Sequence, residues 1–441
     1  MDRAADLLLA AQAVLPGGVC ASARANAAIG RPFFVSRGEG AYLFDLDGKA
    51  YLDMCTSHGA SLLGHKHPAI TAAVQAAMEL GVLCACETEH QTRLAERLRA
   101  MVPCAEMARF AGSGTETVMH GLRLARVATG RSRFIKFEGH FHGYADALNY
   151  SVMPPPDRAG PADKPIAYAE SAGMPGRNAD DVIVLPFNDP LALRAAFERH
   201  GSEVAALLME PVNYDQGCIE PAPGFAELCR VLCDQHGALL FFDEVLTAFR
   251  VAPGGAQQVL GVTPDLCVLG KAFGAGMPIS ALVGKRAVMR HLKPLGESQM
   301  SGTYLAHLSG VLAALAALEA YAGAGFHARL FELAERFRSG FAQQVARSGA
   351  VVRMQQLGPR FGLYFGVDTP VTNYRQAAQR DLAAELVFIR GCHEHGVYLQ
   401  PSAHHGFSAA HSSADIDFAL DAMGKALRLV RDHQAHKGRN G

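Results

Sequence analysis

The chain has 441 residues, of which 49% are apolar, so it is long enough for two or three structural units with buried cores. Its 41 basic and 42 acidic residues nearly cancel, whereas a nucleic-acid-binding protein normally carries a basic excess. No apolar run has the length of a membrane span, and the N-terminal segment is typical of an amphipathic helix rather than a signal peptide. We therefore expect a cytoplasmic protein without a nucleic-acid or membrane partner.

The first β-rich segment covers residues 32–54. Three short runs have strand character, and an Asp47-Gly48 pair between the last two predicts a hairpin turn. The expected strands are Phe33–Val35, Ala41–Asp45 and Tyr51–Asp53.

From Pro68 onward, segments with helical periodicity alternate with short apolar runs. The predicted helices are 68–81, 93–101, 116–129, 190–200 and 224–236, and the predicted strands are 108–110, 134–137, 182–185, 205–209, 238–242 and 266–269. Short, uniformly apolar strands between helices are typical of an α/β fold whose mostly parallel sheet is covered by helices on both faces.

Two further segments complete the organisation. Residues 149–179 are rich in Pro and Gly, as expected of a lid or binding loop. A long helix is expected from Ser309 to Tyr321, followed by a smaller α+β domain, and the basic residues from Arg431 to Gly441 are expected to fray. The predicted domains are an N-terminal segment 1–60 that joins the small domain, a large domain 61–310 and a C-terminal small domain 311–441.

The ten cysteines are scattered, and none forms a Cys-x-x-Cys pair. Cys229 and Cys233 would share a helix face, but no second pair of ligands follows at the spacing of a zinc site. We expect reduced thiols in the core and no bound metal.

Asp243 and Lys271 each end a predicted strand. Open α/β sheets place their ligand sites at the carboxyl ends of their strands. A buried carboxylate requires a partner, and a lysine in an apolar pocket is neutral more often and can attack a carbonyl group. Solvated strand ends without a ligand would show the same pattern.

Small residues precede the helix predicted at 116–129. In the segment Gly112 to Thr115, backbone N–H groups, hydroxyls and the helix dipole could together hold an anion. A capped turn without a ligand remains the alternative.

The segment 138–143 (EGHFHG) follows the strand predicted at 134–137. Phe141 could stack on a flat ring, and His142 could hydrogen-bond a cofactor. Together with the anion site, the strand-end acid and the strand-end lysine, these residues form the set that a pyridoxal phosphate site requires.

At these residues the sequence resembles the class III aminotransferases of pyridoxal-phosphate fold type I, and within them the glutamate-1-semialdehyde aminomutase branch. The resemblance runs from residues 16–19 (PGGV) to 398–402 (YLQPS). Its most specific stretches are 109–116 (RFAGSGTE), 136–146 (KFEGHFHGYAD), 210–212 (EPV), 242–250 (FDEVLTAFR), 264–271 (PDLCVLGK) and 301–304 (SGTY).

The resemblance implies pyridoxal 5′-phosphate as cofactor, held as an internal aldimine on Lys271, which would also move the substrate proton. Asp243 would hold the pyridine nitrogen, while Val245 and Phe141, often Tyr in the family, would cover the two ring faces. The phosphate would be bound by Ser113, Gly114 and Thr115.

The resemblance assigns three further residues and a homodimer with sites at its interface. Glu210 would order the site, and Thr303 would reach the phosphate of the neighbouring subunit. Arg24 would take a substrate carboxylate, for which its bidentate geometry is suited. An exposed structural arginine is the alternative for Arg24.

Three departures from the aminomutase pattern affect the expected reaction. The small-residue gating loop is replaced by the Pro-rich segment 151–176, Ala21 stands where the aminomutase has Ser, and the loop 402–407 lacks an acidic residue. We therefore expect ping-pong transamination between an amino acid or amine and an oxo acid. An intramolecular aminomutase, a racemase and a catalytically silent binding protein of this fold are the alternatives.

Overall fold

The computed structural model describes residues 3–401 and 404–440 and divides into two units. The central unit comprises Pro68–His327 and Val371–Ala378. The terminal unit comprises Met1–His67, Ala328–Pro370 and Gln379–Gly441. Among the described residues, no single helix is both long and apolar enough to span a membrane. One pair of helices, Leu308–Tyr321 and Phe326–Ser348, reaches this length and hydropathy only together, and the pair is bent by 73°.

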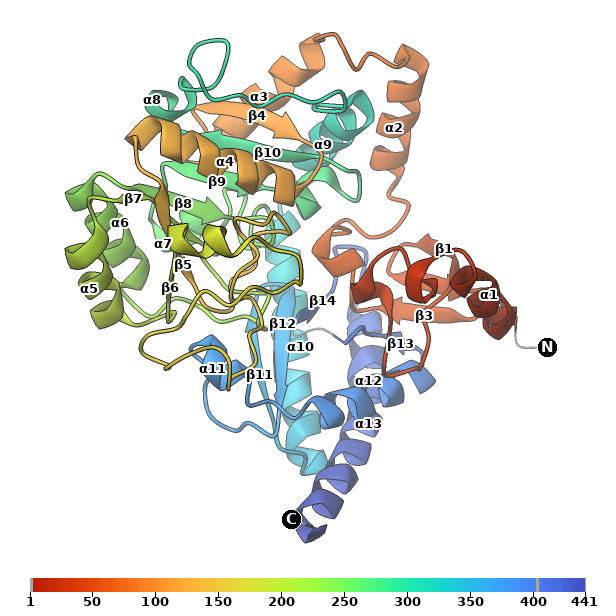
Figure 1. Cartoon of the computed structure of the whole chain (residues 1–441). Helices are drawn as coiled ribbons and strands as arrows, with labels where there is room; N and C mark the ends of the chain where they lie inside the picture. Colours follow the sequence, from red (N-terminus) through yellow and green to blue (C-terminus); the bar gives the residue numbers. More distant parts are fainter. Residues whose placement is uncertain (1–2, 402–403, 441) are drawn as a thin grey trace. The chain divides into compact units, whose positions relative to one another are not determined.

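The central unit is built on a seven-stranded sheet (Figure 1). Its strands, in spatial order, are β4 (Met107–Ala111), β10 (Ser280–Gly284), β9 (Leu266–Leu269), β8 (Leu239–Asp243), β7 (Val204–Met209), β5 (Arg133–Phe137) and β6 (Val182–Leu185). All neighbours from β9 to β6 are parallel, and β10 is antiparallel to both β4 and β9. The predicted α/β class with a mostly parallel sheet is confirmed.

The α-helices of the central unit are α2 (Pro68–Leu80), α3 (Glu89–Met101), α4 (Gly114–Thr129), α5 (Pro190–His200), α6 (Phe225–His236), α7 (Ala256–Leu260), α8 (Arg286–Met289), α9 (Leu308–Tyr321) and α11 (Tyr374–Ala377). Of these, α3, α4, α6 and α8 pack directly on strands of the sheet. The ring of Phe241 in β8 points at α4, since a Cβ on Gly121 would come within 2.4 Å of it. Because side chains alternate along a strand, Asp243 faces the same side as Phe241.

Two details of the central unit differ from the prediction. Helix α3 begins at Glu89 instead of Arg93, because Thr88 and Gln91 form a capping box that satisfies the free N–H groups of its first turn. Strand β10 was not predicted, since the run SALVG is only five residues long.

The segment 149–179 has little regular structure, as expected, but it is tightly fastened. The Arg375 side chain donates hydrogen bonds to the carbonyls of Pro156, Ala159 and Gly160 at 3.2, 2.9 and 3.0 Å. The same guanidinium makes an ion pair with Glu138 at 2.7 Å. None of the described residues 149–179 lines the pocket at the end of β8.

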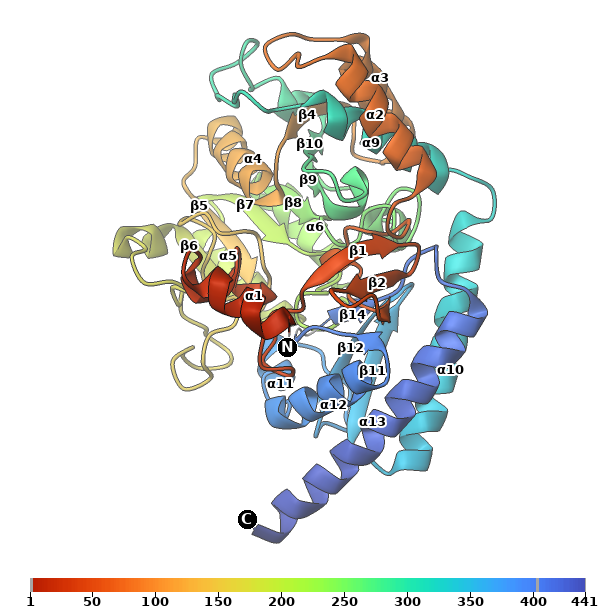
Figure 2. The same ribbon diagram turned by 90° about the vertical axis from the view of Figure 1, so that its right-hand side faces the viewer.

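The terminal unit contains two small sheets (Figure 2). The first has the order β1 (Val35–Glu39), β2 (Tyr42–Asp45), β3 (Ala50–Asp53) and β13 (Val397–Tyr398), and the second has the order β11 (Val352–Leu357), β12 (Arg360–Phe365) and β14 (His404–Gly406). Its helices are α1 (Arg3–Gln12), α10 (Phe326–Ser348), α12 (Leu382–Glu394) and α13 (Ser413–Asn440). A shared core joins the N- and C-terminal segments, because Leu52 and Met54 belong to the same buried cluster as Phe337 and Phe361.

The hairpin turn at Asp47-Gly48 is confirmed between β2 and β3. The Asp45 carboxylate accepts the N–H groups of Asp47 and Lys49 at 3.0 and 2.8 Å, which fixes the turn. The first strand was misplaced, because β1 runs from Val35 to Glu39 rather than from Phe33 to Val35. The N-terminal helix is present as α1, although none of its residues is buried.

The domain boundaries fall after His67 and His327 instead of after residues 60 and 310. His65 exchanges backbone hydrogen bonds with Gly40, which places residues 61–67 in the terminal unit. Helix α9 belongs to the central unit, where the Tyr321 hydroxyl donates to the carbonyl of Ala272 at 2.7 Å.

The fraying expected from Arg431 is wrong for the described residues, because α13 continues to Asn440. Lys437 pairs with Asp381 at 2.8 Å, and Gln434 bonds to both backbone groups of Val351 at 2.9 Å, so this last part of the helix is anchored. Gly441, like Ser402 and Ala403 of the loop compared above, lies outside the described residues.

Candidate active site

A pocket of about 250 Å³ lies within the central unit at the carboxyl end of β8. It brings together nine of the residues predicted from the sequence. They come from the start of α4, the segment after β5, the ends of β7 and β8 and the turn after β9: Ser113, Gly114, Thr115, Phe141, His142, Glu210, Asp243, Val245 and Lys271.

The N-terminus of α4 forms one side of this pocket. Ser113 caps the helix by accepting the Glu116 N–H at 3.2 Å, and its hydroxyl hydrogen stays available for donation. The 16-residue helix directs the positive end of its dipole at this point. Gly143 is required here, because its φ is 95° and a Cβ would lie 2.5 Å from the Thr115 hydroxyl oxygen. The result is a compact anion cradle.

Asp243 is held at the floor of the pocket by two hydrogen bonds. One oxygen accepts the Val245 N–H at 3.1 Å, and the other lies 2.9 Å from His142 Nδ1. Burial lowers the pKa of His142 despite the opposing effect of Asp243, so the neutral ring donates its Nδ1–H to the carboxylate. The pair therefore brings a negative charge to the pocket.

Glu210 orients the segment that carries Phe141. Its carboxylate accepts the Phe141 N–H at 2.9 Å, and its own N–H donates to Nδ1 of His140 at 3.0 Å. Burial, followed by the charges of Asp215 and Asp243, raises the pKa of Glu210 well above its usual range. This carboxyl group therefore tends toward its neutral form.

Buried Lys136 also holds the segment that carries Phe141. Its ammonium donates to the carbonyl of His140 at 2.9 Å and to that of Tyr150, and burial lowers its pKa to about 8. Lys136 thus connects the segment behind Phe141 to the start of the Pro-rich loop.

The walls of the pocket are apolar. Phe141 and Val245 both line it, and Val245 packs so closely on two glycines that a Cβ on Gly114 or Gly270 would lie 3.1 or 3.3 Å from its methyl groups. Both side chains are suited to contact the face of a flat ring.

Lys271 enters the pocket from a strained turn. It is a non-glycine residue with φ of 47°, in the left-handed region, at the first position of a 3₁₀ turn that ends at Gly274. Backbone strain of this kind costs about 1–3 kcal/mol and is concentrated at functional sites. The turn presents the lysine amine to the same pocket as the Asp243 carboxylate.

The sequence model of the class III aminotransferases matches residues 23–427. The chain belongs to the class III aminotransferase family. Class III aminotransferases are pyridoxal-phosphate-dependent enzymes, so the cofactor is pyridoxal 5′-phosphate.

Solved structures of other proteins resemble this aminotransferase over nearly its whole length. An omega-transaminase from Sphaerobacter thermophilus is 33% identical, with a TM-score of 0.90 and coverage of 97% of this chain and 98% of the other. A β-phenylalanine aminotransferase from Variovorax paradoxus is 30% identical, with a TM-score of 0.83 and coverage of 96% and 92%. A glutamate-1-semialdehyde aminomutase from Pseudomonas aeruginosa PAO1 shares the fold at 23% identity, with a TM-score of 0.87 and coverage of 97% and 94%.

The residues of this aminotransferase fit the cofactor. The α4 N-terminus suits its phosphate, the Phe141 and Val245 walls suit its ring, and the Asp243 carboxylate suits its ring nitrogen. The Lys271 amine suits its aldehyde. The anion cradle, the apolar walls, the acid and the amine thus match four different parts of the cofactor.

Two predicted site residues do not line this pocket. Thr303 is exposed in the central unit, in the turn before α9. Arg24 is exposed in the terminal unit, at the end of a short 3₁₀ turn.

Five lining residues of the aminotransferase were missed. Asp215 follows the end of β7, so its place after a strand was a usable signal. The apolar residues gave no such signal, because they resemble core residues in sequence: Leu246, Met277, Pro278 and Ile279. Among the described residues, no group of three or more His, Cys, Asp or Glu could hold a metal ion.

Proposed function

We propose that this enzyme transfers an amino group between an amino acid or amine and an oxo acid in two half-reactions at Lys271. One observation carries the proposal: the Lys271 amine and the Asp243 carboxylate line one pocket with an anion cradle between strand and helix.

When bound, pyridoxal phosphate supplies an aldehyde that accepts the amino group and a ring that withdraws electrons from the substrate Cα. Lys271 would move a proton from the substrate Cα to the cofactor carbon that receives the amino group, and would move a proton back along the same path in the second half-reaction, because its amine lines the pocket. Asp243, oriented by His142, keeps the ring nitrogen protonated. Phe141 and Val245 hold the ring flat and exclude water from its faces.

The substrate side of the pocket favours an apolar group next to the amine. Leu246, Met277 and Ile279 add apolar surface to that of Phe141. Two similar structures belong to proteins named an omega-transaminase and a β-phenylalanine aminotransferase. We infer that the amino donor is an amine or β-amino acid with an apolar substituent.

Borohydride trapping tests the role of Lys271. Reduction of the cofactor-loaded enzyme should attach the cofactor irreversibly to the peptide that contains Lys271, as mapped by mass spectrometry. Lys271→Ala should lose the adduct and all turnover while it keeps its fold. An adduct on Lys136 or another lysine would refute the assignment.

A half-reaction assay tests the chemistry. Without an acceptor, β-phenylalanine or 1-phenylethylamine should convert the enzyme-bound cofactor to its amino form, followed by absorbance, with release of one oxo product per site. Pyruvate or 2-oxoglutarate should then reverse the change. Isomerisation of a donor without release of an oxo product would instead indicate an aminomutase.

We further propose that the active form is a homodimer in which Thr303 completes the anion cradle of the partner subunit. The exposure of Thr303 supports this role. Sedimentation should give a dimer, and Thr303→Ala should weaken cofactor binding about tenfold, the effect of one lost charge-assisted hydrogen bond. A fully active monomer would contradict the proposal.

A further inference from the structure

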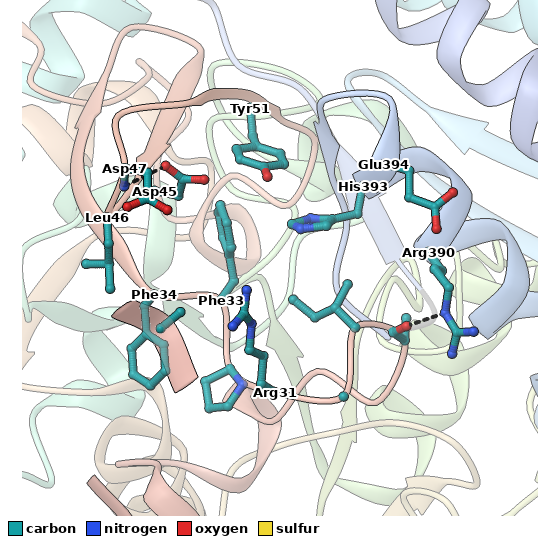
Figure 3. A pocket seen from close by; sticks show the side chains of 15 residues that line it. Arg31, Phe33, Phe34, Asp45, Leu46, Asp47, Tyr51, Arg390, His393 and Glu394 are labelled. Atoms are coloured by element: carbon teal, nitrogen blue, oxygen red, sulfur yellow. Dashed lines mark hydrogen bonds between the residues drawn. The ribbon is translucent and has the colours of Figure 1, made fainter. Parts of the chain in front are cut away.

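A second pocket, of about 570 Å³, lies entirely within the terminal unit. It is bounded by residues 28–34, the β2–β3 turn and the end of α12 (Figure 3). Its volume is in the usual range for small-molecule sites, and no residue lines both this pocket and the cofactor pocket.

Charges of both signs line this second pocket. There are three carboxylates and two guanidinium groups: Asp45, Asp47, Glu394, Arg31 and Arg390. Figure 3 shows the two aspartates on one side and the α12 pair, Arg390 and Glu394, on the opposite side. A simple anion would meet the carboxylates and a simple cation would meet the guanidinium groups, so a ligand that carries both charges is favoured.

The α12 pair is free to bind such a ligand. Arg390 uses only its Nε, which donates to the Ala28 carbonyl at 2.8 Å, and its two terminal nitrogens bond to no described residue. The Glu394 carboxylate likewise makes no hydrogen bond or ion pair with a described residue. The two side chains are one helical turn apart but do not pair within 4.0 Å.

Aromatic rings form the wall beside the α12 pair. Tyr51 stacks on His393 with centroids 4.6 Å apart, and Phe33 lies edge-on to both at 4.9 and 5.3 Å. Burial lowers the pKa of His393 to about 4, so the His393 ring is uncharged at neutral pH. Phe34 also lines the pocket and stacks on no ring among the described residues, which leaves its face available.

We propose that this pocket is a second ligand site that binds a free amino acid with an apolar or aromatic side chain. Arg390 takes the α-carboxylate through its two terminal nitrogens, and Glu394 takes the ammonium group. The side chain of the ligand rests against Phe33, Phe34 and Tyr51. The site is separate from the cofactor pocket, because none of these residues lines that pocket.

Hydrogen–deuterium exchange of the cofactor-loaded enzyme tests the proposal with L-phenylalanine as the probe. Millimolar L-phenylalanine should protect peptides that cover residues 28–34 and 386–394. The analogues 3-phenylpropanoate and 2-phenylethylamine, which each lack one charge, should not protect them. Protection confined to peptides around Lys271 would show binding at the cofactor pocket alone and would overturn the proposal.

Matched variants assign the effect to the α12 pair. Glu394→Gln and Arg390→Gln should each raise the L-phenylalanine concentration for half-maximal protection at least about tenfold. Glu332→Gln, an exposed change on α10, should leave it unchanged. Equal protection in Glu394→Gln and the unmodified enzyme would refute the site, whether or not the enzyme transaminates.

Discussion

At the scale of single residues, Asp243 decides the electrostatics of the cofactor pocket. Asp243→Asn removes the negative charge that would keep the ring nitrogen protonated. We expect kcat/KM to fall by about 10³, or about 4 kcal/mol of transition-state stabilisation. Steady-state kinetics with Asp243→Glu as the charge-preserving comparison would measure this, and activity of Asp243→Asn within tenfold of the unmodified enzyme would contradict the role.

His142 acts through Asp243. His142→Phe removes the donor at 2.9 Å from the carboxylate, and we expect cofactor affinity to fall about tenfold, since losing the partner of a buried charged group costs about 1–3 kcal/mol. His142→Asn keeps an N–H donor and should restore most of the affinity. Titration of each variant with the cofactor, followed by absorbance, measures this affinity. Equal losses of affinity in His142→Phe and His142→Asn would indicate that His142 has only a packing role.

At the scale of elements, α4 is pressed against β8 at one glycine. A Cβ on Gly121 would lie 2.4 Å from the buried ring of Phe241. Gly121→Ala should therefore lower the free energy of unfolding by about 2 kcal/mol through overpacking, although alanine favours helix. Urea unfolding would measure it, with Val127→Ala on the same helix expected to stay within about 0.5 kcal/mol.

The Pro-rich segment is a fastened element rather than a free lid. Besides the bonds of Arg375, the Tyr374 hydroxyl donates to the Pro154 carbonyl at 2.7 Å. Arg375→Met should release this segment and also leave the buried Glu138 without its ion pair, so limited proteolysis within residues 150–170 should accelerate at least about fivefold. Arg177→Met, an exposed change after the same segment, serves as the control. Unchanged cleavage in Arg375→Met would contradict the fastening.

At the scale of the whole molecule, buried histidines in both units make stability depend on pH. Burial lowers the pKa of His140 and His142 in the central unit, and of His405 to about 3 and His411 to about 4 in the terminal unit. Each folded-state pKa lies below the unfolded value of about 6.5, so the unfolded chain binds more protons in acid. The contribution of these neutral histidines to the free energy of unfolding is complete above about pH 6.5 and is lost as the pH falls toward 4.

We expect the free energy of unfolding to drop between pH 7.5 and pH 5 by up to about 1.4 kcal/mol per pH unit for each such histidine. Urea midpoints at the two values would measure the drop. Replacing the exposed His395 with Gln should leave this drop unchanged. If the urea midpoint of the unmodified enzyme were the same at both pH values, the role of the buried histidines would be contradicted.

Much of the central unit could be predicted because its signals are local. The apolar runs that became β6 and β9 and the Pro-initiated helix α5 have the predicted bounds, since burial of both sheet faces leaves a continuous apolar pattern in the sequence. The strand-end positions of Asp243 and Lys271 were visible for the same reason. Strand β10 and the start of α3 were missed, because an antiparallel insertion and a capping box depend on neighbours that periodicity does not reveal.

The sequence by itself determined the fold class, the family and the set of side chains for the cofactor, since each depends on residue types and spacing along the chain. Only the tertiary structure decided that His142 donates to Asp243, that Arg375 fastens a loop more than 200 residues away, and that α9 belongs to the central unit. These contacts join residues distant in sequence, and burial and hydrogen-bond geometry, which no local pattern encodes, select them.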